Sequence, residues 1–516
     1  MTDQGSVGDE DQSTSFDDQS TALAPVGGDG GVSSRRWRSL WRVHFYSGVF
    51  AAPFLILMAI TGLMILYLQP LQDLTQGDLR TVTPSGTVQS VDALEQSVEQ
   101  AYPDQAVTSM VTPIDADHSY GFGLDNGRTV FVNQYTGKVL GDIDPTGDWL
   151  YVGRRLHGQL NNTSIKVSLP TVSALWDDGA VMRDYVVGDL VLEVFGVWTL
   201  VLMASGIYLW WPRRGASATS RARTGRTLLG IRLGKQGRAR WRDLHAVPGL
   251  VMFSILTVTL VSGMAWSTYW GANFTALANK ISPNTWTDAP ASPLGSRGDL
   301  ERLGNSIEWN TGSIPTPRSF GLPTDGTVAA PLKLSDVVAI AEQEGMKPGY
   351  SVSLPDNSTT DDAGNPIYGS FLMSNSWPRK TGEARDVYLN QFTGAKLTEA
   401  DAYGYGTISY AMDTVVSWHM GTQWGIVTRI FMTMLCVLTI WMVTSAVVMY
   451  WKRRRSGTLG LPRRPLDVKL AKRLAIIAVG LGIVYPEWGV TALAVLAIDR
   501  FAIRKVPRLR VAFGQR

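Results

Sequence analysis

Residues 41–62 read WRVHFYSGVFAAPFLILMAITG, and residues 241–263 read WRDLHAVPGLVMFSILTVTLVSG. Both stretches begin with a Trp-Arg pair and a histidine, continue through apolar residues, and end with a hydroxyl residue followed by glycine. In each stretch the hydroxyl residue lies 17 positions after the histidine. Apolar segments of this length are long enough to cross a bilayer as helices. The two stretches therefore predict two similar membrane-spanning helices.

Four apolar runs of this kind occur in the 516-residue chain, at about 45–68, 187–211, 246–269 and 426–451. A soluble protein can bury one such helix, but four of them indicate a multi-pass membrane protein in contact with lipid. Hydrophobic residues make up 45% of the chain and charged residues 18%, which excludes disorder for most of its length. The formal net charge of +3 gives no indication of a nucleic-acid partner.

Basic residues predict the orientation of the spans. Four arginines lie between residues 35 and 42, ten Lys/Arg and no acid lie within 212–242, and a Lys-Arg-Arg-Arg run begins at Lys452. Basic flanks favour the cytoplasmic side, so we expect these segments inside and the long acidic segments outside. The first run is full-length and reads as a signal anchor. The sequence therefore predicts a cytoplasmic (inner or plasma) membrane protein with a cytoplasmic N-terminus.

These features divide the chain into alternating membrane and aqueous segments. The last apolar stretch is interrupted at Tyr485-Pro486-Glu487 and has basic residues on both sides, which favours a hairpin over a fifth span. The expected segments are a disordered acidic cytoplasmic tail (1–34), a first span (35–68), a first extracytoplasmic module (69–185), a second span (186–211), a basic cytoplasmic loop (212–243), a third span (244–269), a second extracytoplasmic module (270–425), a fourth span (426–451), a basic cytoplasmic linker (452–473), a hydrophobic hairpin or fifth span (474–498) and a basic tail (499–516).

The second and fourth spans also resemble each other. Ser205, Trp211 and an Arg-Arg pair in the second correspond to Ser445, Trp451 and an Arg-Arg pair in the fourth. Sequence similarity between halves is typical of membrane proteins built from internal repeats. We expect two span–module–span units, related by a pseudo-two-fold axis along the membrane normal and packed against each other.

The two outer modules share a pattern as well. VFVNQYTGKVL at 130–140 matches VYLNQFTGAKL at 387–397, and the alternation of apolar residues around a Thr-Gly turn predicts a β-hairpin in each. Each hairpin follows an amphipathic helix, at 90–101 and 335–344, for which Ser90 and Ser335 are the expected N-caps. The outer modules are therefore predicted to be α+β.

Four of the five histidines occupy equivalent places in the two halves. His44 and His245 lie at the cytoplasmic ends of the first and third spans, and His157 and His419 lie near the outer ends, before the second and fourth spans. Ionisable residues at such positions indicate function. The fifth, His118, stands in a polar stretch without a counterpart and is expected in an exposed loop.

Two symmetric histidine pairs suit a planar cofactor with two axial positions. We expect His44 with His245 to bind one haem b near the cytoplasm, and His157 with His419 to bind a second near the outer face. Gly48 and Gly249 would let a porphyrin lie against the helix backbone. Zinc or copper is the rival metal, although two histidines without carboxylates or thiolates make a poor zinc site. Cys436, the single cysteine, leaves no site for covalent haem attachment.

In these features the chain resembles the PepSY-associated transmembrane family, the iron-regulated membrane proteins that include ferric-siderophore reductases. The resemblance covers about 35–460 and rests on the order of the Trp-Arg…His…Gly…Thr-Gly span, LHGQL, GIYLWWPRR, WHMG and the two Asn-Gln-aromatic-Thr-Gly hairpins. It implies a di-haem protein that passes electrons outward to reduce iron chelates. It also implies that His44, His157, His245 and His419 are the haem-iron ligands.

Two other functions remain open at this point. PepSY modules elsewhere resemble inhibitors or propeptides of secreted proteases, so the outer modules could regulate a peptidase. The spans could instead transport an iron chelate, although such proteins have more polar groups at mid-span than Glu193 and Arg429 provide here. The chain lacks a Gly-rich dinucleotide fingerprint, so the expected electron donor is a quinol or a cytoplasmic reductase.

Overall fold

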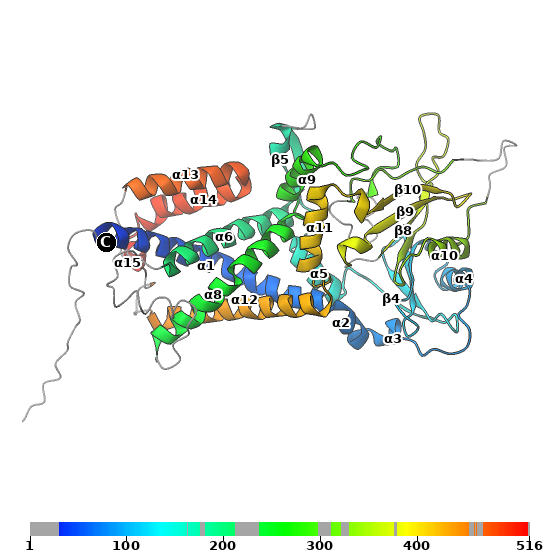
Figure 1. Cartoon of the computed structure of the whole chain (residues 1–516), viewed down its shortest axis with the longest axis horizontal. Coiled ribbons are helices and arrows are strands. Elements are labelled where there is room, and N and C mark those ends of the chain that lie inside the picture. The colour runs from blue at the N-terminus through cyan, green and yellow to red at the C-terminus, as the bar shows by residue number, and fades with distance from the viewer. Residues whose placement is uncertain are drawn as a thin grey trace, which may run out of the picture.

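The structure is a computed structural model. It describes residues 30–162, 164–175, 181–211, 237–297, 311–320, 330–375, 379–453, 459, 461 and 468–513. Long helices form a bundle at one end of the elongated molecule, and strands with shorter helices form a mixed region at the other end (Figure 1). The expected division into a membrane part and α+β modules is confirmed at this level.

Four of the described helices are long and apolar enough to cross a membrane: α1 (Gly30–Leu66), α6 (Val187–Trp210), α8 (Arg238–Met264) and α12 (Ile426–Arg453). Helix α1 packs against α6 and α12, while α8 packs against α12 and α6. Many apolar side chains of these helices point outward, among them Ile60, Val251 and Ile430. Outward apolar surface of this kind suits contact with lipid, which explains why so little of each helix is buried within the protein.

The ends of the spans differ slightly from the prediction. Helix α1 begins at Gly30, inside the tail that the sequence assigns to residues 1–34, and α8 ends at Met264 rather than near residue 269. Residues 1–29 of the predicted tail and residues 212–236 of the predicted basic loop lie outside the described residues.

The C-terminal apolar stretch folds back on itself. Helices α13 (Val468–Val484) and α14 (Pro486–Ile498) are joined by Tyr485, and each is too short to cross a bilayer alone. A Cβ added to Gly489 would lie 3.0 Å from the Cα of Gly482, so glycine at these positions allows the two helices to pack closely. Helix α14 packs against α6 (Figure 1). A π-helical turn (Asp499–Ile503) and α15 (Pro507–Ala512) follow.

Eight of the described strands form one antiparallel sheet in the order β10-β9-β8-β7-β1-β2-β3-β4. Strand β1 pairs with β7, so the sheets of the two modules meet edge to edge and become continuous. The strands of the first module are β1 (Val107–Val111), β2 (Tyr120–Leu124), β3 (Thr129–Val132) and β4 (Val139–Ile143). Those of the second are β7 (Ser351–Ser353), β8 (Ser370–Ser374), β9 (Arg385–Asn390) and β10 (Lys396–Asp401).

Helices α4 (Val91–Ala101) and α10 (Leu334–Gln343) lie side by side against this sheet and share one apolar core with it. Ser90 caps α4 as predicted, because its side chain accepts a hydrogen bond from the amide of Ala93. The prediction for Ser335 is wrong, since α10 begins at Leu334 and its N-cap is Lys333. The amide and hydroxyl of Ser335 donate instead to the carboxylate of Asp92 on α4, so this residue joins the two modules.

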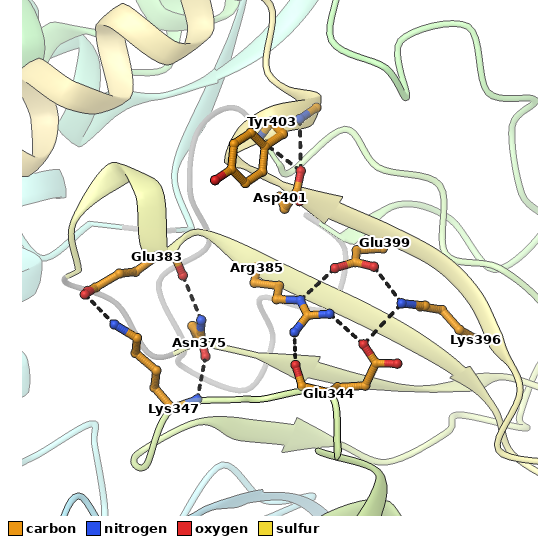
Figure 2. A network of polar contacts seen from close by, with 10 residues as sticks. Glu344, Lys347, Asn375, Glu383, Arg385, Lys396, Glu399, Asp401 and Tyr403 are labelled. Carbon is orange, nitrogen blue, oxygen red and sulfur yellow. Dashed lines mark hydrogen bonds and ion pairs between the residues drawn. The ribbon is translucent and has the colours of Figure 1, made fainter. Parts of the chain in front are cut away.

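Both predicted hairpins are present, β3–β4 and β9–β10, with Gly137 and Gly394 at positive φ in their turns. An arginine at the start of each hairpin pairs with an acid on the returning strand, Arg128 with Asp142 and Arg385 with Glu399. In the second module the pair extends to Glu344 and Lys396, which ties α10 to the hairpin (Figure 2).

Shorter elements connect the sheet to the bundle. Helices α2 (Leu68–Thr75) and α3 (Gly77–Arg80) continue from α1, α5 (Trp149–Gln159) follows β4, α9 (Tyr269–Ile281) follows α8, and α11 (Thr407–His419) follows β10. A second sheet pairs β5 (Lys166–Pro170) with β6 (Met182–Val186). In the described chain, 3-10 turns cover Val172–Leu175, Thr381–Glu383 and Ala402–Gly404.

Candidate functional site

The structure brings His44 of α1 beside His245 of α8. Their ring centroids are 6.4 Å apart, and the ring planes cross at 84°. Both rings are half-buried within the bundle. The two helices belong to different halves of the chain, so this pair exists only because the halves pack together.

The structure also brings His157 beside His419. Their ring centroids are 6.3 Å apart, and the planes cross at 72°. Neither residue lies on a spanning helix, because α5 and α11 are short helices that end at or near these histidines. The two pairs thus have nearly the same separation but are built on different elements.

The two pairs lie at opposite depths of the bundle. The ring of His157 contacts Thr61 on α1, and Thr61 follows His44 by 17 residues on the same helix. At about 1.5 Å per residue, this places the pairs about 25 Å apart along the helix. A hydrocarbon core is about 30 Å thick, so one pair lies toward each face of the membrane.

A hydroxyl side chain contacts the Nδ1 atom of each ring. Ser205 on α6 lies 3.2 Å from Nδ1 of His44, and Ser445 on α12 lies 2.9 Å from Nδ1 of His245. At the pair on the side of the modules (His157 and His419, called the outer pair for this position), Thr61 lies 2.8 Å from Nδ1 of His157. Ser262 on α8 lies 3.1 Å from Nδ1 of His419. Each hydroxyl comes from the same half of the chain as its histidine.

These contacts assign the proton on each imidazole. All four hydroxyls donate to a carbonyl one turn earlier on their own helix, those of Leu202, Leu57, Met442 and Thr259. A hydroxyl that has used its only proton can offer just a lone pair to the ring. Nδ1 therefore carries the hydrogen, and Nε2 keeps the free lone pair that a metal ion requires.

Glycines lie against three of the rings. A Cβ added to Gly62 would be 3.3 Å from Cε1 of His157, and the same atom at Gly206 would be 3.1 Å from Cε1 of His44. At Gly263 it would be 3.2 Å from Cε1 of His419. The hydroxyl-glycine dipeptides of the sequence thus hold the histidine rings in place, with the hydroxyl bonding the ring and the glycine giving it room.

Two other glycines have different neighbours. The side chain of Leu202 lies against Gly48 and that of Met442 against Gly249, and the expectation that these glycines leave space for a porphyrin stays a prediction. The sequence signal that locates three of the rings is the hydroxyl-glycine step at 61–62, 205–206 and 262–263, whose function the sequence alone does not reveal. In the fourth span Ser445 is followed by alanine instead.

The donor set of each pair fits haem iron better than a metal held by protein alone. The ring centroids of the two pairs are 6.4 and 6.3 Å apart, close enough for both imidazoles of a pair to bind one metal ion. Among the described residues, no group of three or more His, Cys, Asp or Glu side chains gathers around a common point. Two histidines per site would complete the ligands of a haem iron, because the porphyrin supplies the other four nitrogens. A zinc ion held by the same two histidines would lack two of its four ligands.

The outer pair is anchored to the two modules. Asp148 is the N-cap of α5, and its carboxylate also accepts a hydrogen bond from Gln76 at the end of α2. Helix α11 is tied to the 3-10 turn of the second module, because Thr381 donates to Gln423 and to Ser417. Burial raises the pKa of Asp413 on the same helix. A shift of α5 or α11 would therefore move a histidine of the outer pair.

His118 lies away from both pairs and is not the exposed loop residue that the sequence predicts. Its ring is half-buried, with Nδ1 2.6 Å from Asp115 and Nε2 3.3 Å from Asp73 on α2. Burial alone would lower its pKa, but the two carboxylates raise the pKa of His118 above its usual value. This histidine helps to fix the first module to the end of the first span.

Comparisons with known proteins support a relationship along most of the chain. The family model for the PepSY-associated TM region matches residues 41–453, which contain all four paired histidines and both outer modules. A search of curated proteins found no match.

Proposed function

The chain belongs to the PepSY-associated transmembrane family, and on this premise we propose that it is a di-haem protein that carries electrons across the cytoplasmic membrane to a ferric siderophore or a similar iron chelate outside. The observation that carries the proposal is the pair of facing imidazoles at each depth, both of whose rings leave Nε2 available. Bound haem supplies reversible one-electron chemistry at each pair.

The residues of the chain would have three tasks in this function. His44 and His245 would hold the inner haem, and His157 and His419 the outer one. The four hydroxyls fix the tautomer and the orientation of the rings, as the outer partners of metal-ligating histidines do in general. The spans exclude water from the region between the pairs. A separation of about 25 Å along the helix then suits transfer from one membrane face toward the other.

The proposed direction follows from charge. The basic segments at 212–242 and after Lys452 are expected on the cytoplasmic side, where they suit an acidic reductase or anionic lipid headgroups. We propose a cytoplasmic reductase or a membrane quinol as the donor. The outer modules stand beyond the outer histidine pair, so the acceptor would be a ferric chelate on that side.

The first test is cofactor content. The full chain, purified in detergent from haem-replete cells, should contain about two b-type haems and show sharp α-band absorbance after reduction with dithionite. Variants His44→Ala and His245→Ala should each retain the outer haem alone, and His157→Ala and His419→Ala the inner haem alone. His118→Ala serves as the matched control and should retain both. A colourless protein from such cells would rule out the proposal.

The second test concerns direction. Protein reconstituted into vesicles with an enclosed donor should reduce an external ferric chelate when the modules face outward. His419→Ala should abolish this reduction, and His118→Ala should leave it unchanged. Reduction at the normal rate by His419→Ala vesicles would mean that electrons do not leave through the outer pair.

A further inference from the structure

Two carboxyl groups lie inside the membrane part of the molecule without a basic partner among the described residues. Glu193, two turns into α6, is 1% exposed, and both carboxyl oxygens of Glu487, at the tip of the α13–α14 hairpin, are buried. The two side chains lie in the same region, because Trp270, whose amide donates to Glu193, packs against a buried cluster that contains Trp488, the residue after Glu487. No ion pair joins either glutamate to a basic residue in the part of the chain that the structure describes. Burying an ionisable group at this depth costs free energy, so such groups mark functional sites.

The two glutamates have different surroundings. Oε1 of Glu193 accepts hydrogen bonds from the backbone amides of Tyr269 (2.8 Å) and Trp270 (3.1 Å), at the start of α9. Amides at a helix N-terminus stabilise an anion. Within the described chain, no other residue donates a hydrogen bond to either oxygen of Glu487. A buried carboxylate without donors from other residues, and close to another carboxylate, is much less stable than the neutral acid.

Further buried polar atoms without partners in the described chain surround the pair. Besides Oε2 of Glu193, they are the indole Nε1 of Trp488, which is 3% exposed, and the hydroxyl of Tyr185, which is 1% exposed. Unsatisfied buried polar atoms are rare in native structures and mark a place where a proton, water or polar ligand belongs. The titratable groups that face the pair are the phenols of Tyr269 and Tyr485, and Tyr185 packs against Tyr269. Asp189, one turn earlier on α6, is buried with a partner of its own.

Packed residues connect the pair to the outer histidines. Gly263 contacts the ring of His419, and the next residue, Met264, packs against Gly196 of α6 and shares a buried cluster with Trp488. Trp488 in turn lies near Trp198, whose indole donates to Thr491 of α14. Glu487, the residue before Trp488, is thus linked to His419 through Met264 and Gly263.

We propose that Glu193 and Glu487 share a single proton, carried by Glu487, and form a proton-binding site coupled to the outer histidine pair. The coupling rests on the proposed function. At a pH at which the pair has lost this proton, the arrival of one electron at the outer site is accompanied by uptake of one proton by the pair from the outer water. When the electron passes to the ferric chelate, which is reduced from iron(III) to iron(II), the proton returns to the water.

The proton site itself can be tested without any haem. Infrared spectra of the full chain in nanodiscs are compared as wild type minus Glu487→Gln, so that the bands of other protonated carboxyls such as Glu95 cancel. The difference should contain a protonated-carboxyl band near neutral pH that shifts in D2O. The same difference taken in a Glu193→Gln background should keep this band and show it titrating at lower pH, because the like charge is gone. The exposed Glu342→Gln on α10 is the matched control, and its difference from wild type should contain no such band. A wild-type minus Glu487→Gln difference without the band would overturn the proposal.

The coupling is tested by redox titration of the haem-loaded chain. The midpoint potential of the outer haem should fall as the pH rises, by up to about 59 mV per unit for one proton per electron. The inner haem should show a smaller slope, and Glu487→Gln should flatten the outer one. An unchanged outer slope in a folded Glu487→Gln protein would refute the coupling. Failure to bind haem would refute the proposed function but leave the infrared result to decide on the proton site.

Discussion

The inner and outer histidine pairs have nearly equal ring separations, 6.4 and 6.3 Å, but differ in their supports. Inner histidines stand on spanning helices and receive their hydroxyl contacts from other spans. Outer histidines stand on short helices that the modules hold against the ends of the spans. The comparison teaches that the inner site depends on the bundle alone, whereas the outer site depends on the bundle and the modules together.

The largest expected effect comes from crowding a ring. Gly206→Val should displace His44, and Gly263→Val should displace His419, because even a Cβ would lie within about 3.2 Å of either ring. We expect each variant to lose one haem of two, the inner and the outer one respectively. Gly158→Val is the control, since nothing lies within 4 Å of its Cβ position although it follows His157 directly. Equal haem loss in the control would contradict this reading of the glycines.

Destabilising the second module should affect haem binding at the outer site only. Arg297 and Asp386 form a buried ion pair, completed by Ser374, between a loop of that module and β9. Asp386→Ala would remove the carboxylate that pairs with the buried charge of Arg297, at a cost of about 3–5 kcal/mol. Thermal titrations followed by haem absorbance should show the outer haem lost at a lower temperature and the inner haem unchanged. Parallel loss of both haems would mean that the two sites are not independent.

Removing a hydroxyl that contacts a histidine ring should affect the outer pair more than the inner pair. Nδ1 of His44 also donates to the carbonyl of Leu202 (3.0 Å), whereas Thr61 provides the hydrogen bond found for His157. Thr61→Val should therefore weaken haem binding at the outer pair by about 10–100-fold, and Ser205→Ala should weaken the inner pair less. Competition with apomyoglobin for haem measures both affinities. A larger effect of Ser205→Ala would show that the carbonyl of Leu202 does not support His44.

The smallest expected effect is a pH dependence confined to the modules. Burial, together with the carboxylates of Glu99 and Asp92, raises the pKa of Glu95 to about 7 from its ordinary value near 4.5. An acid with a raised pKa stabilises the folded state fully below its unfolded pKa, and this contribution disappears as the pH rises through about 7.

Glu95→Gln should therefore stabilise the modules at pH 8 and not at pH 4, by about 1 kcal/mol after allowance for partial exposure. Thermal unfolding at the two pH values measures this difference. Haem binding at the two sites should not change in Glu95→Gln. A stabilisation of equal size at both pH values would show that ionisation of Glu95 is not its cause.

Much of the architecture follows from local sequence patterns. Runs of apolar residues at 45–68, 187–211, 246–269 and 426–451 mark the spans, because the thickness of a bilayer fixes how many apolar residues a helix needs. Alternation and a Thr-Gly turn mark each outer hairpin, because a strand repeats every two residues. Four histidines are likewise singled out by their repeated positions along the chain.

Contacts between distant segments were decided by the tertiary structure alone. Nothing local in the sequence states that Ser335 bonds Asp92, that β1 pairs with β7, or that Glu487 meets Glu193. The same holds for the hydroxyl-glycine steps, whose partners lie on another helix. Local patterns record which residues prefer apolar or extended surroundings. The pairing of the imidazoles depends on how the helices of the two halves pack. This packing is determined by contacts among many side chains that are far apart in the chain.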